Sequence, residues 1–412
     1  MLAELVFVTR LLGLMSGSRS IEMQVDPAVH AVEVVLDGKR TTTLRGAPWR
    51  TTVDFGPDLA PHELTAIARD AEGRELATDT QLVNLPRPQA EIGVMFTRKG
   101  GKTRANIRWQ HIAGRQPAKM TVKMGARTLA SVVTRSVTIP EVPPEALNVL
   151  SVDLQFDDGS SAHRDLVFGG FAEEMPAELT ATLVKKRSKG RTDPARCFRS
   201  EGQPVAATEV ELGDAAVLIV RAGVPPTQLV DKTRKSAAPE GSFAIPRASV
   251  RFIWPVATDS GYSDLFLTSD VFPAMRGLRF LLTRVQGPMG LTFRLTDAVA
   301  VAGTEALREP RRRAVVLVLG SEVDASRYQA ATVRRYLERI GVSLHVWSLT
   351  GRGPHSSWGE VEDISSSNSL LRAVARLRDD LDGQRIAWLP LDPIHALHVR
   401  TTAECAWEPL AK

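Results

Sequence analysis

Two apolar runs decide the fold of the second half of this chain: AAVLIV at residues 215–220 and AVVLVL at residues 314–319. A strand buried on both faces needs such a run, because helices cover both sides of a parallel sheet. Residues 295–307 and 328–340 lie on either side of the second run and have the apolar spacing of helices. The alternation of strands and helices predicts an α/β domain with a doubly wound, mostly parallel sheet.

The first half has the pattern of antiparallel β structure. Short alternating runs between residues 20 and 87 are separated by turn residues, among which Asp37-Gly38 is a strong hairpin signal. Residues 92–168 repeat this pattern, and neither segment shows helical periodicity. The sequence therefore predicts two all-β, immunoglobulin-like sandwiches of about 80 residues each.

The chain of 412 residues is too long for one ordinary core and is predicted to be multidomain. The predicted parts are an immunoglobulin-like sandwich over residues 1–87, a second sandwich over 88–175, a basic linker over 176–200 and the α/β domain over 201–412. The prolines at 86 and 88 mark the first boundary.

Composition excludes several classes of protein. Hydrophobic residues make up 43% and charged residues 24%, as in globular proteins, which argues against a disordered chain, a coiled coil or a collagen-like fibre. No apolar run is long enough for a transmembrane helix. The net charge of +5 is modest for this length and does not indicate a specific nucleic-acid partner.

One stretch is clearly basic, and we considered two interpretations of it. The stretch runs from Lys185 to Arg199, and its first part contains Lys185, Lys186, Arg187, Lys189 and Arg191. It could bind a polyanion or an anionic surface. The favoured interpretation is a solvated linker, because aromatic residues do not alternate with the basic ones as in a single-strand nucleic-acid groove.

The sequence predicts no catalytic residue, no cofactor and no metal ligand. His395 and His398 form a close histidine pair, but a metal site would need a third ligand nearby. The serines at 356–357 and 366–367 do not lie in the Gly-x-Ser-x-Gly turn that presents a nucleophile.

The second half resembles a von Willebrand factor type A domain. The resemblance rests on the order of strands, on Gly290-Leu291-Thr292 before the helix at 295–307, and on the strand at 314–319. The text of this region is similar to bacterial proteins labelled VWFA-related, in which immunoglobulin-like modules often precede the A domain. Residues 21–87 in turn resemble a bacterial immunoglobulin-like module.

The chain departs from that family where the family binds a divalent cation. The first strand of a type A domain ends in Asp-x-Ser-x-Ser, whereas residues 221–225 here read RAGVP. Thr292 could be the family's threonine, and Glu322 and Asp324 are the nearby carboxylates, expected to pair with Arg221 or face solvent. Since Mg²⁺ requires oxygen ligands, the resemblance implies a degenerate edge without metal. Arg221, Thr292, Glu322 and Asp324 are then candidates for contacting a partner.

The resemblance also implies a disulfide. Cys197 and Cys405 lie just before the first buried strand and just after the last one, where some type A domains join their two ends. The pair is expected to be bridged if the protein is exported, and to be two separate thiols otherwise.

Taken together, the sequence favours a non-enzymatic interaction or adhesion-type protein with an unidentified protein partner. The alternatives are a polyanion binder that uses the basic stretch, and an enzyme whose site is dispersed along the sequence. The protein is expected to be extracytoplasmic, either periplasmic or secreted, if a leader precedes Met1, and cytoplasmic otherwise. The sequence does not predict an oligomeric state.

Overall fold

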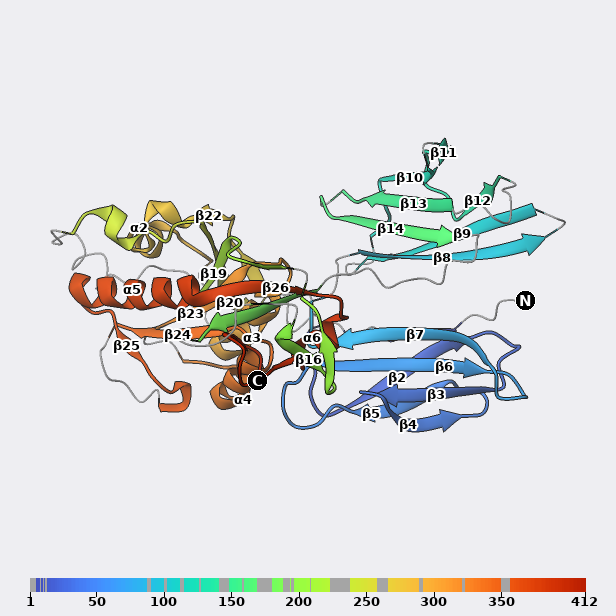
Figure 1. Ribbon diagram of the computed structural model, residues 1–412, viewed down its shortest axis with the longest axis horizontal. Helices are drawn as coiled ribbons and strands as arrows, with labels where there is room; N and C mark the ends of the chain where they lie inside the picture. The colour runs from blue at the N-terminus through green and yellow to red at the C-terminus, as the bar shows by residue number, and fades with distance from the viewer. Residues whose placement is uncertain are drawn as a thin grey trace.

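The computed structural model contains two β-sandwiches and an α/β body (Figure 1). It describes residues 5–412 except 8, 10, 12, 87–89, 100–101, 112–114, 126, 141–147, 158, 169–179, 188–192, 194–195, 208, 223–237, 258–265, 289–291, 321–322 and 350–355. Strands predominate over helices in this part of the chain. The first sandwich lies at the lower right of Figure 1, the second at the upper right and the α/β body at the left.

The first sandwich is built from two antiparallel sheets. One has the order β1-β2-β5, with strands Leu5–Phe7, Ser18–Val25 and Arg50–Asp54. The other has the order β4-β3-β6-β7, with strands Lys39–Leu44, Ala31–Leu36, His62–Arg69 and Glu75–Val83. Along β6 every second side chain is buried, as a strand with one face on a core requires.

The second sandwich repeats the strand order of the first. Its sheets have the orders β8-β9-β12 and β11-β10-β13-β14. The strands are Ala90–Lys99 (β8), Lys102–His111 (β9), Lys119–Met124 (β10), Arg127–Ala130 (β11), Ser136–Ile139 (β12), Asn148–Gln155 (β13) and Ser161–Phe168 (β14). In each sandwich the first, second and fifth strands face the fourth, third, sixth and seventh. The prediction of two β-sandwiches is confirmed.

The α/β body is centred on a sheet of order β21-β20-β19-β23-β24-β25. Strands β20, β19, β23, β24 and β25 run parallel, while β21 and the short β22 pair antiparallel with β20. The strands are Ala215–Val220 (β19), Ala248–Ala257 (β20), Phe266–Thr268 (β21), Phe272–Pro273 (β22), Arg312–Leu319 (β23), Ser343–Ser348 (β24) and Glu362–Asp363 (β25). The two apolar runs of the sequence are β19 and β23, adjacent at the centre.

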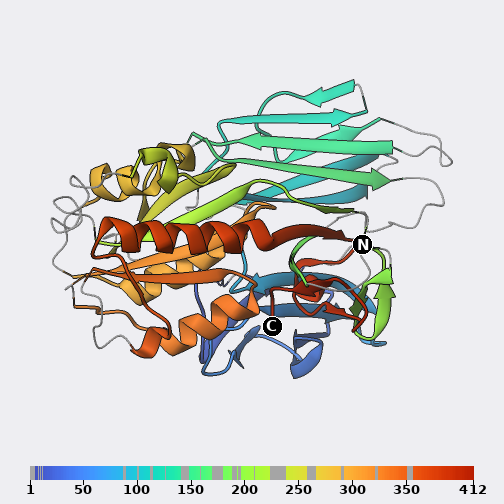
Figure 2. The same ribbon diagram turned by 60° about the vertical axis from the view of Figure 1, so that its left-hand side comes forward.

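Helices cover both faces of this sheet. Helices α2 (Leu278–Arg284) and α5 (Ser367–Gly383) pack on one face, and α3 (Leu295–Ala306) and α4 (Ala330–Arg339) pack on the other. Figure 2 shows α5 running alongside the strands of the sheet. Short 3-10 turns occur at Glu240–Phe243 (η2), Ala274–Arg276 (η3) and Ser356–Trp358 (η4).

A separate antiparallel sheet joins the two ends of the α/β segment. Its order is β18-β26-β15-β28, with strands Glu209–Glu211, Gln384–Leu389, Thr180–Lys186 and Trp407–Pro409. Beside it lies a small sheet of order β17-β16-β27, with strands Gln203–Val205, Phe198–Ser200 and Arg400–Thr401. Helix α6 (Pro393–Leu397) lies next to these strands. We call these elements the closing sheets.

The closing sheets correct one expectation from the sequence. Strand β15 occupies part of the predicted linker at 176–200, because Thr182, Leu183 and Val184 are buried against β26. The strand at 384–389 belongs to this antiparallel sheet and not to the parallel one. The basic residues that follow Val184 made this segment look like a solvated linker in the sequence.

The first sandwich packs directly against the α/β body. Leu14, Leu59 and Leu85 of the sandwich belong to the same buried cluster as α3 and α4. The Tyr336 hydroxyl on α4 donates a hydrogen bond to the carbonyl oxygen of Asn84, at 2.8 Å. Within the described residues, no helix is long and apolar enough to cross a membrane.

Candidate functional site

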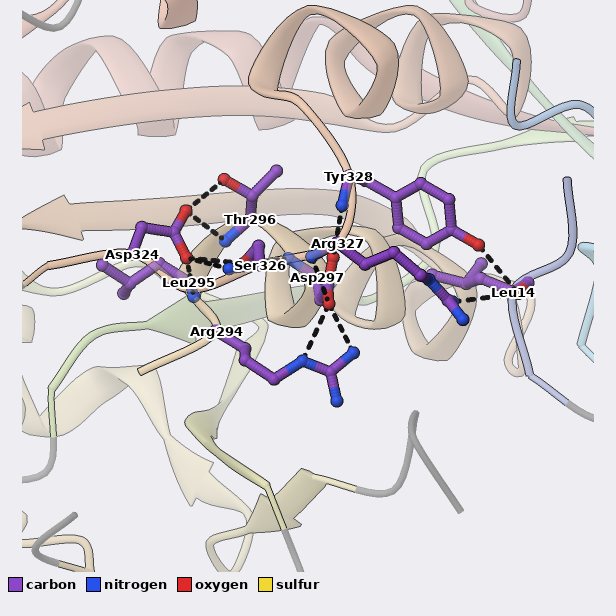
Figure 3. A network of polar contacts seen from close by, with 9 residues as sticks. All are labelled: Leu14, Arg294, Leu295, Thr296, Asp297, Asp324, Ser326, Arg327 and Tyr328. Atoms are coloured by element: carbon purple, nitrogen blue, oxygen red, sulfur yellow. Dashed lines mark hydrogen bonds and ion pairs between the residues drawn. The ribbon is translucent and has the colours of Figure 1, made fainter. Parts of the chain in front are cut away.

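The carboxyl edge of the parallel sheet carries a network of polar contacts around the start of α3 (Figure 3). The loop after β23 brings Asp324 to the amino end of this helix. The Asp324 carboxylate accepts hydrogen bonds from the backbone N–H groups of Leu295 and Thr296, at 2.9 and 3.2 Å. It also accepts bonds from the hydroxyls of Thr296 and Ser326, both at 2.5 Å. Asp324 therefore caps α3 from a distant loop, where a negative charge favours the helix dipole.

Asp297 is the second carboxylate of the network, and it is fully buried within the first turn of α3. One oxygen accepts hydrogen bonds from Nε of Arg294 at 2.8 Å and from the backbone N–H of Arg327 at 3.1 Å. The other accepts the backbone N–H of Tyr328 at 3.0 Å. A buried carboxylate requires such partners, because an unpaired charge there is strongly unfavourable.

These contacts decide what the edge can do chemically. Both carboxylates are already surrounded by hydrogen-bond donors, and Arg294 also forms an ion pair with Asp297. A divalent cation would have to displace those donors to reach the same oxygens. Among the described residues, no three His, Cys, Asp or Glu side chains come together as a metal site would need. These hydrogen bonds join the loop at 323–328 to α3.

Arg221 does not take the position expected for an interaction residue. Only 1% of its surface is exposed, and its Nη atoms donate to the carbonyl oxygens of Ala222 and Val285. Its guanidinium carbon lies 5.1 and 5.2 Å from the ring centres of Phe252 and Trp254. The side chain is directed into the core under α2, because it can donate hydrogen bonds and stack on aromatic rings there. Arg221 is therefore not available to pair with a carboxylate of a partner.

The other expected edge residues differ in their surroundings. Thr292 and Asp324 are exposed, and exposure to solvent is one of the two alternatives expected for Asp324. Glu322 lies outside the described residues. Between Glu322 and Asp324, Val323 is 84% exposed. An apolar side chain on a loop that is held this firmly has no evident role in folding.

The basic stretch is divided between a strand and residues outside the description. The exposed Lys185 and Lys186 are in β15, and Lys185 forms an ion pair with Asp380 on α5 at 3.3 Å. Arg187 pairs with Glu408 at 3.4 Å. Lys189 and Arg191 lie outside the described residues. Carboxylates thus partly neutralise the described end of the stretch.

Cys197 and Cys405 form a disulfide in the closing sheets, with Cα atoms 5.3 Å apart. That separation lies within the range that disulfides span. The bridge closes the α/β segment over a sequence separation of 208 residues. His395 is on α6, where its Nδ1 lies 2.5 Å from the carboxylate of Asp392.

Asp297 has only a weak signal in the sequence. From the sequence, Asp297 could lie on an exposed polar face of the helix at 295–307, whereas the structure buries it completely. An aspartate among Leu, Ala and Val at the start of a helix is the signal that could have identified it. Asp324 was recognisable as a carboxylate near the edge, but its cap contacts join residues 28 and 29 positions apart.

Comparisons with known proteins find distant structural neighbours and no family. No protein-family model matches this sequence, and a search of curated proteins gives no match either. The chain is similar to the fibronectin(III)-like modules of Clostridium thermocellum CbhA, with 12% identity and a TM-score of 0.17 over 40% of this chain and 92% of that one. It is also similar to the central fibronectin-III array of RIM-binding protein, with 14% identity and a TM-score of 0.24 over 50% and 81% of the two chains. These neighbours are fibronectin III-like β-sandwich modules, and the likeness concerns the fold alone.

Other neighbours correct an expectation. They are glycoside hydrolases, such as a β-glucuronidase of Parabacteroides merdae, with 12% identity and a TM-score of 0.17 over 40% of this chain and 25% of that one. The prediction that this chain is not an enzyme is contradicted by these neighbours, and we do not keep it. The chain covers about a quarter of each such hydrolase, so the hydrolytic activity belongs to those proteins.

Proposed function

We propose that this chain is a multidomain binding protein that contacts a protein partner at the carboxyl edge of its parallel sheet. The fibronectin III-like sandwiches are modules of the kind that suggests a role in protein interaction. The observation that carries the proposal is Val323, which is 84% exposed on a loop fixed by Asp297 and Asp324. A rigid apolar side chain of this kind is an anchor that a partner's pocket can bury with little loss of conformational freedom.

We further infer that the α/β body is a degenerate von Willebrand A-like domain. Two features support this inference: the sheet order and the antiparallel run of β21 at its edge. We propose domain boundaries at 87 and 175, with β15 and the rest of residues 176–200 assigned to the α/β body. Thr292 and Asp324, both exposed near the start of α3, would contribute polar contacts around Val323.

The network supports a binding role that does not use a metal. Among the described residues, five donor groups surround the Asp324 carboxylate, so its oxygens are engaged in capping α3. The surface that remains for a partner is the rim formed by Val323 and its exposed neighbours. Binding there would bury apolar area and exclude water from the rim contacts.

A matched pair of variants tests the proposal. The partner is captured with wild-type protein, identified by mass spectrometry, purified and titrated against Val323→Arg and Val132→Arg. Val132 is 69% exposed on the second sandwich, so the control makes the same change at another exposed valine. We expect Val323→Arg to weaken binding by about tenfold or more, as for a central anchor residue. Equal binding by wild type and Val323→Arg would contradict the proposed edge.

A further inference from the structure

A cavity of about 530 Å³ lies at the opposite, amino edge of the parallel sheet. Parts of the chain that are far apart in sequence line it: the end of the first sandwich at Leu85, the carboxyl end of α3, the start of β23, strand β15 and helix α6. Its walls are mostly apolar, with Leu183, Ile340 and Leu397 among them. This size and character are typical of a small-molecule site.

Arg313 is a charged side chain in the wall of this cavity. Only 5% of the residue is exposed, and Nε is buried without a hydrogen-bond partner. No hydrogen bond or ion pair joins the Arg313 guanidinium to any residue that the structure describes; only its backbone is bonded, to Gln384. Burial lowers the pKa of Arg313 to about 10, so the group remains protonated at neutral pH.

The adjacent arginine shows what a partnered guanidinium looks like on the same strand. Arg312 is also buried, yet it donates to the carbonyl oxygens of Gly213 and Leu381 and pairs with Asp382 at 3.3 Å. Successive residues of a strand point to opposite faces. Arg312 therefore meets acceptors on one face, and Arg313 meets the cavity on the other.

We propose that this cavity binds a small organic carboxylate with an apolar body, whose carboxylate pairs with the Arg313 guanidinium. A buried positive charge without a partner is unfavourable, and a bound anion removes that penalty. The planar guanidinium matches a carboxylate with two parallel hydrogen bonds. The apolar walls then bury the rest of the ligand. This site is independent of the rim at Val323.

The charges around the cavity favour a monoanion. Glu309 and Arg308 also line it, but Glu309 pairs with Arg311 at 2.6 Å and Arg308 with Glu305 at 2.8 Å. Among the described residues that line the cavity, the Arg313 guanidinium is therefore the one left without a partner. A phosphate would bring a charge of about −1.5 to −2 at neutral pH, which a single guanidinium does not balance.

Isothermal titration of the full chain with octanoate tests the proposal. The matched probes are 1-octanol, which keeps the apolar body, acetate, which keeps the anion, and octyl phosphate. We expect saturable one-to-one binding of octanoate, at least about tenfold tighter than 1-octanol or acetate, because the charge-assisted pair and the apolar burial both contribute.

Substitutions assign that binding to Arg313. Arg313→Met should weaken octanoate binding by about tenfold or more and leave 1-octanol binding unchanged, since only the charged pair is lost. Arg284→Gln removes an exposed positive charge on α2, outside the cavity lining, and should change octanoate binding by less than about twofold. Arg313→Lys, which keeps the charge without the planar fork, should fall between wild type and Arg313→Met.

Three outcomes would overturn the proposal. They are the absence of saturable octanoate binding to wild type, octanoate binding that is the same in Arg313→Met, and tighter binding of octyl phosphate than of octanoate. The unfolding temperature of ligand-free Arg313→Met provides a check on folding. It should equal or exceed that of wild type, because the substitution removes an uncompensated buried charge.

Discussion

The two β-sandwiches have the same strand order but differ in how they join the rest of the molecule. In the first, Leu14, Leu59 and Leu85 pack in the cluster beneath α3 and α4 instead of in the sandwich's own core. Among the described residues, the buried cluster of the second sandwich consists of residues of that sandwich alone. Figure 1 shows the first sandwich alongside the α/β body, with the second above it.

One fold is thus used in two ways in this molecule. A sandwich with a complete core of its own can unfold independently, whereas one that shares a core must unfold together with its neighbour. We therefore expect two thermal transitions: one for the second sandwich, and one for a unit made of the first sandwich, the α/β body and the closing sheets.

Reduction of the Cys197–Cys405 disulfide should have the largest effect. The bridge closes a separation of 208 residues within the unit that contains the α/β body. In the chain-entropy model, opening a loop of that size lowers the free energy of unfolding by up to about 5 kcal/mol. In calorimetry, reductant should lower the unfolding temperature of this unit and leave that of the second sandwich unchanged.

The double variant Cys197→Ser/Cys405→Ser is the control for the reductant. Its transitions should not respond to reductant, since it has no bridge to reduce. Equal shifts of both wild-type transitions would contradict the division into two units.

A pair of leucine truncations tests the shared core next. Leu59 of the first sandwich and Leu150 of the second are both fully buried, the former beneath α4 and the latter within its own sandwich. Each Leu→Ala change should cost about 2–5 kcal/mol, from lost apolar burial and the cavity left behind. Leu59→Ala should lower the transition that includes the α/β body, and Leu150→Ala should lower the other transition alone. If Leu59→Ala left the α/β body unaffected, the first sandwich would be an independent domain.

Much of the fold could be predicted from short-range pattern. The apolar runs that became β19 and β23 identify buried parallel strands, and alternation with turn residues identifies the sandwiches. Pairing between distant segments could not be predicted in this way. Strand β15 pairs with β26 across about 200 residues, and nothing local in either strand specifies the partner.

The candidate site was predictable in location but not in arrangement. The carboxyl edge follows from where the strands end, and Asp324 lies there. The direction of a side chain is set by its tertiary neighbours, so the sequence could not show that Arg221 turns toward Phe252 and Trp254. Arg313 is one of three consecutive arginines, and only the fold gives acceptors to one of them and a cavity to the next.

The two transitions should also differ in how they depend on pH. His345 on β24 lies 3.5 Å from Asp380 and 3.4 Å from Glu362. Burial alone would lower the pKa of His345, but hydrogen bonds to Asp380 and Glu362 outweigh it and raise the pKa to about 9. The unfolded pKa is about 6.5, so the folded state binds the proton more tightly. The resulting stabilisation is fully present below pH 6.5 and is lost as the pH rises through about 9.

His345→Gln should remove that dependence. Between pH 6 and 10, calorimetry should show that the free energy of unfolding of the unit with the α/β body falls by about 1–3 kcal/mol more in wild type than in His345→Gln. The transition of the second sandwich should be the same in both proteins. An identical pH profile for both α/β transitions would contradict the proposed role of the His345 proton.

The smallest expected effect tests whether the first sandwich is held by charge or by apolar contact. Asp58 of the sandwich lies 2.6 Å from Arg335 and 3.6 Å from Arg339 on α4, and all three side chains are at least one-third exposed. The hydrogen bond from Arg335 lowers the pKa of Asp58, so the pair contributes to stability above about pH 4 and its contribution is lost on further acidification. Exposed pairs contribute only about 0.2–1 kcal/mol, and salt screens them.

Asp58→Asn should therefore lower the unfolding free energy of the shared unit by less than about 1 kcal/mol, with a smaller difference at 1 M salt. A loss as large as that of Leu59→Ala would mean that ion pairs, and not the shared leucine cluster, hold the first sandwich in place.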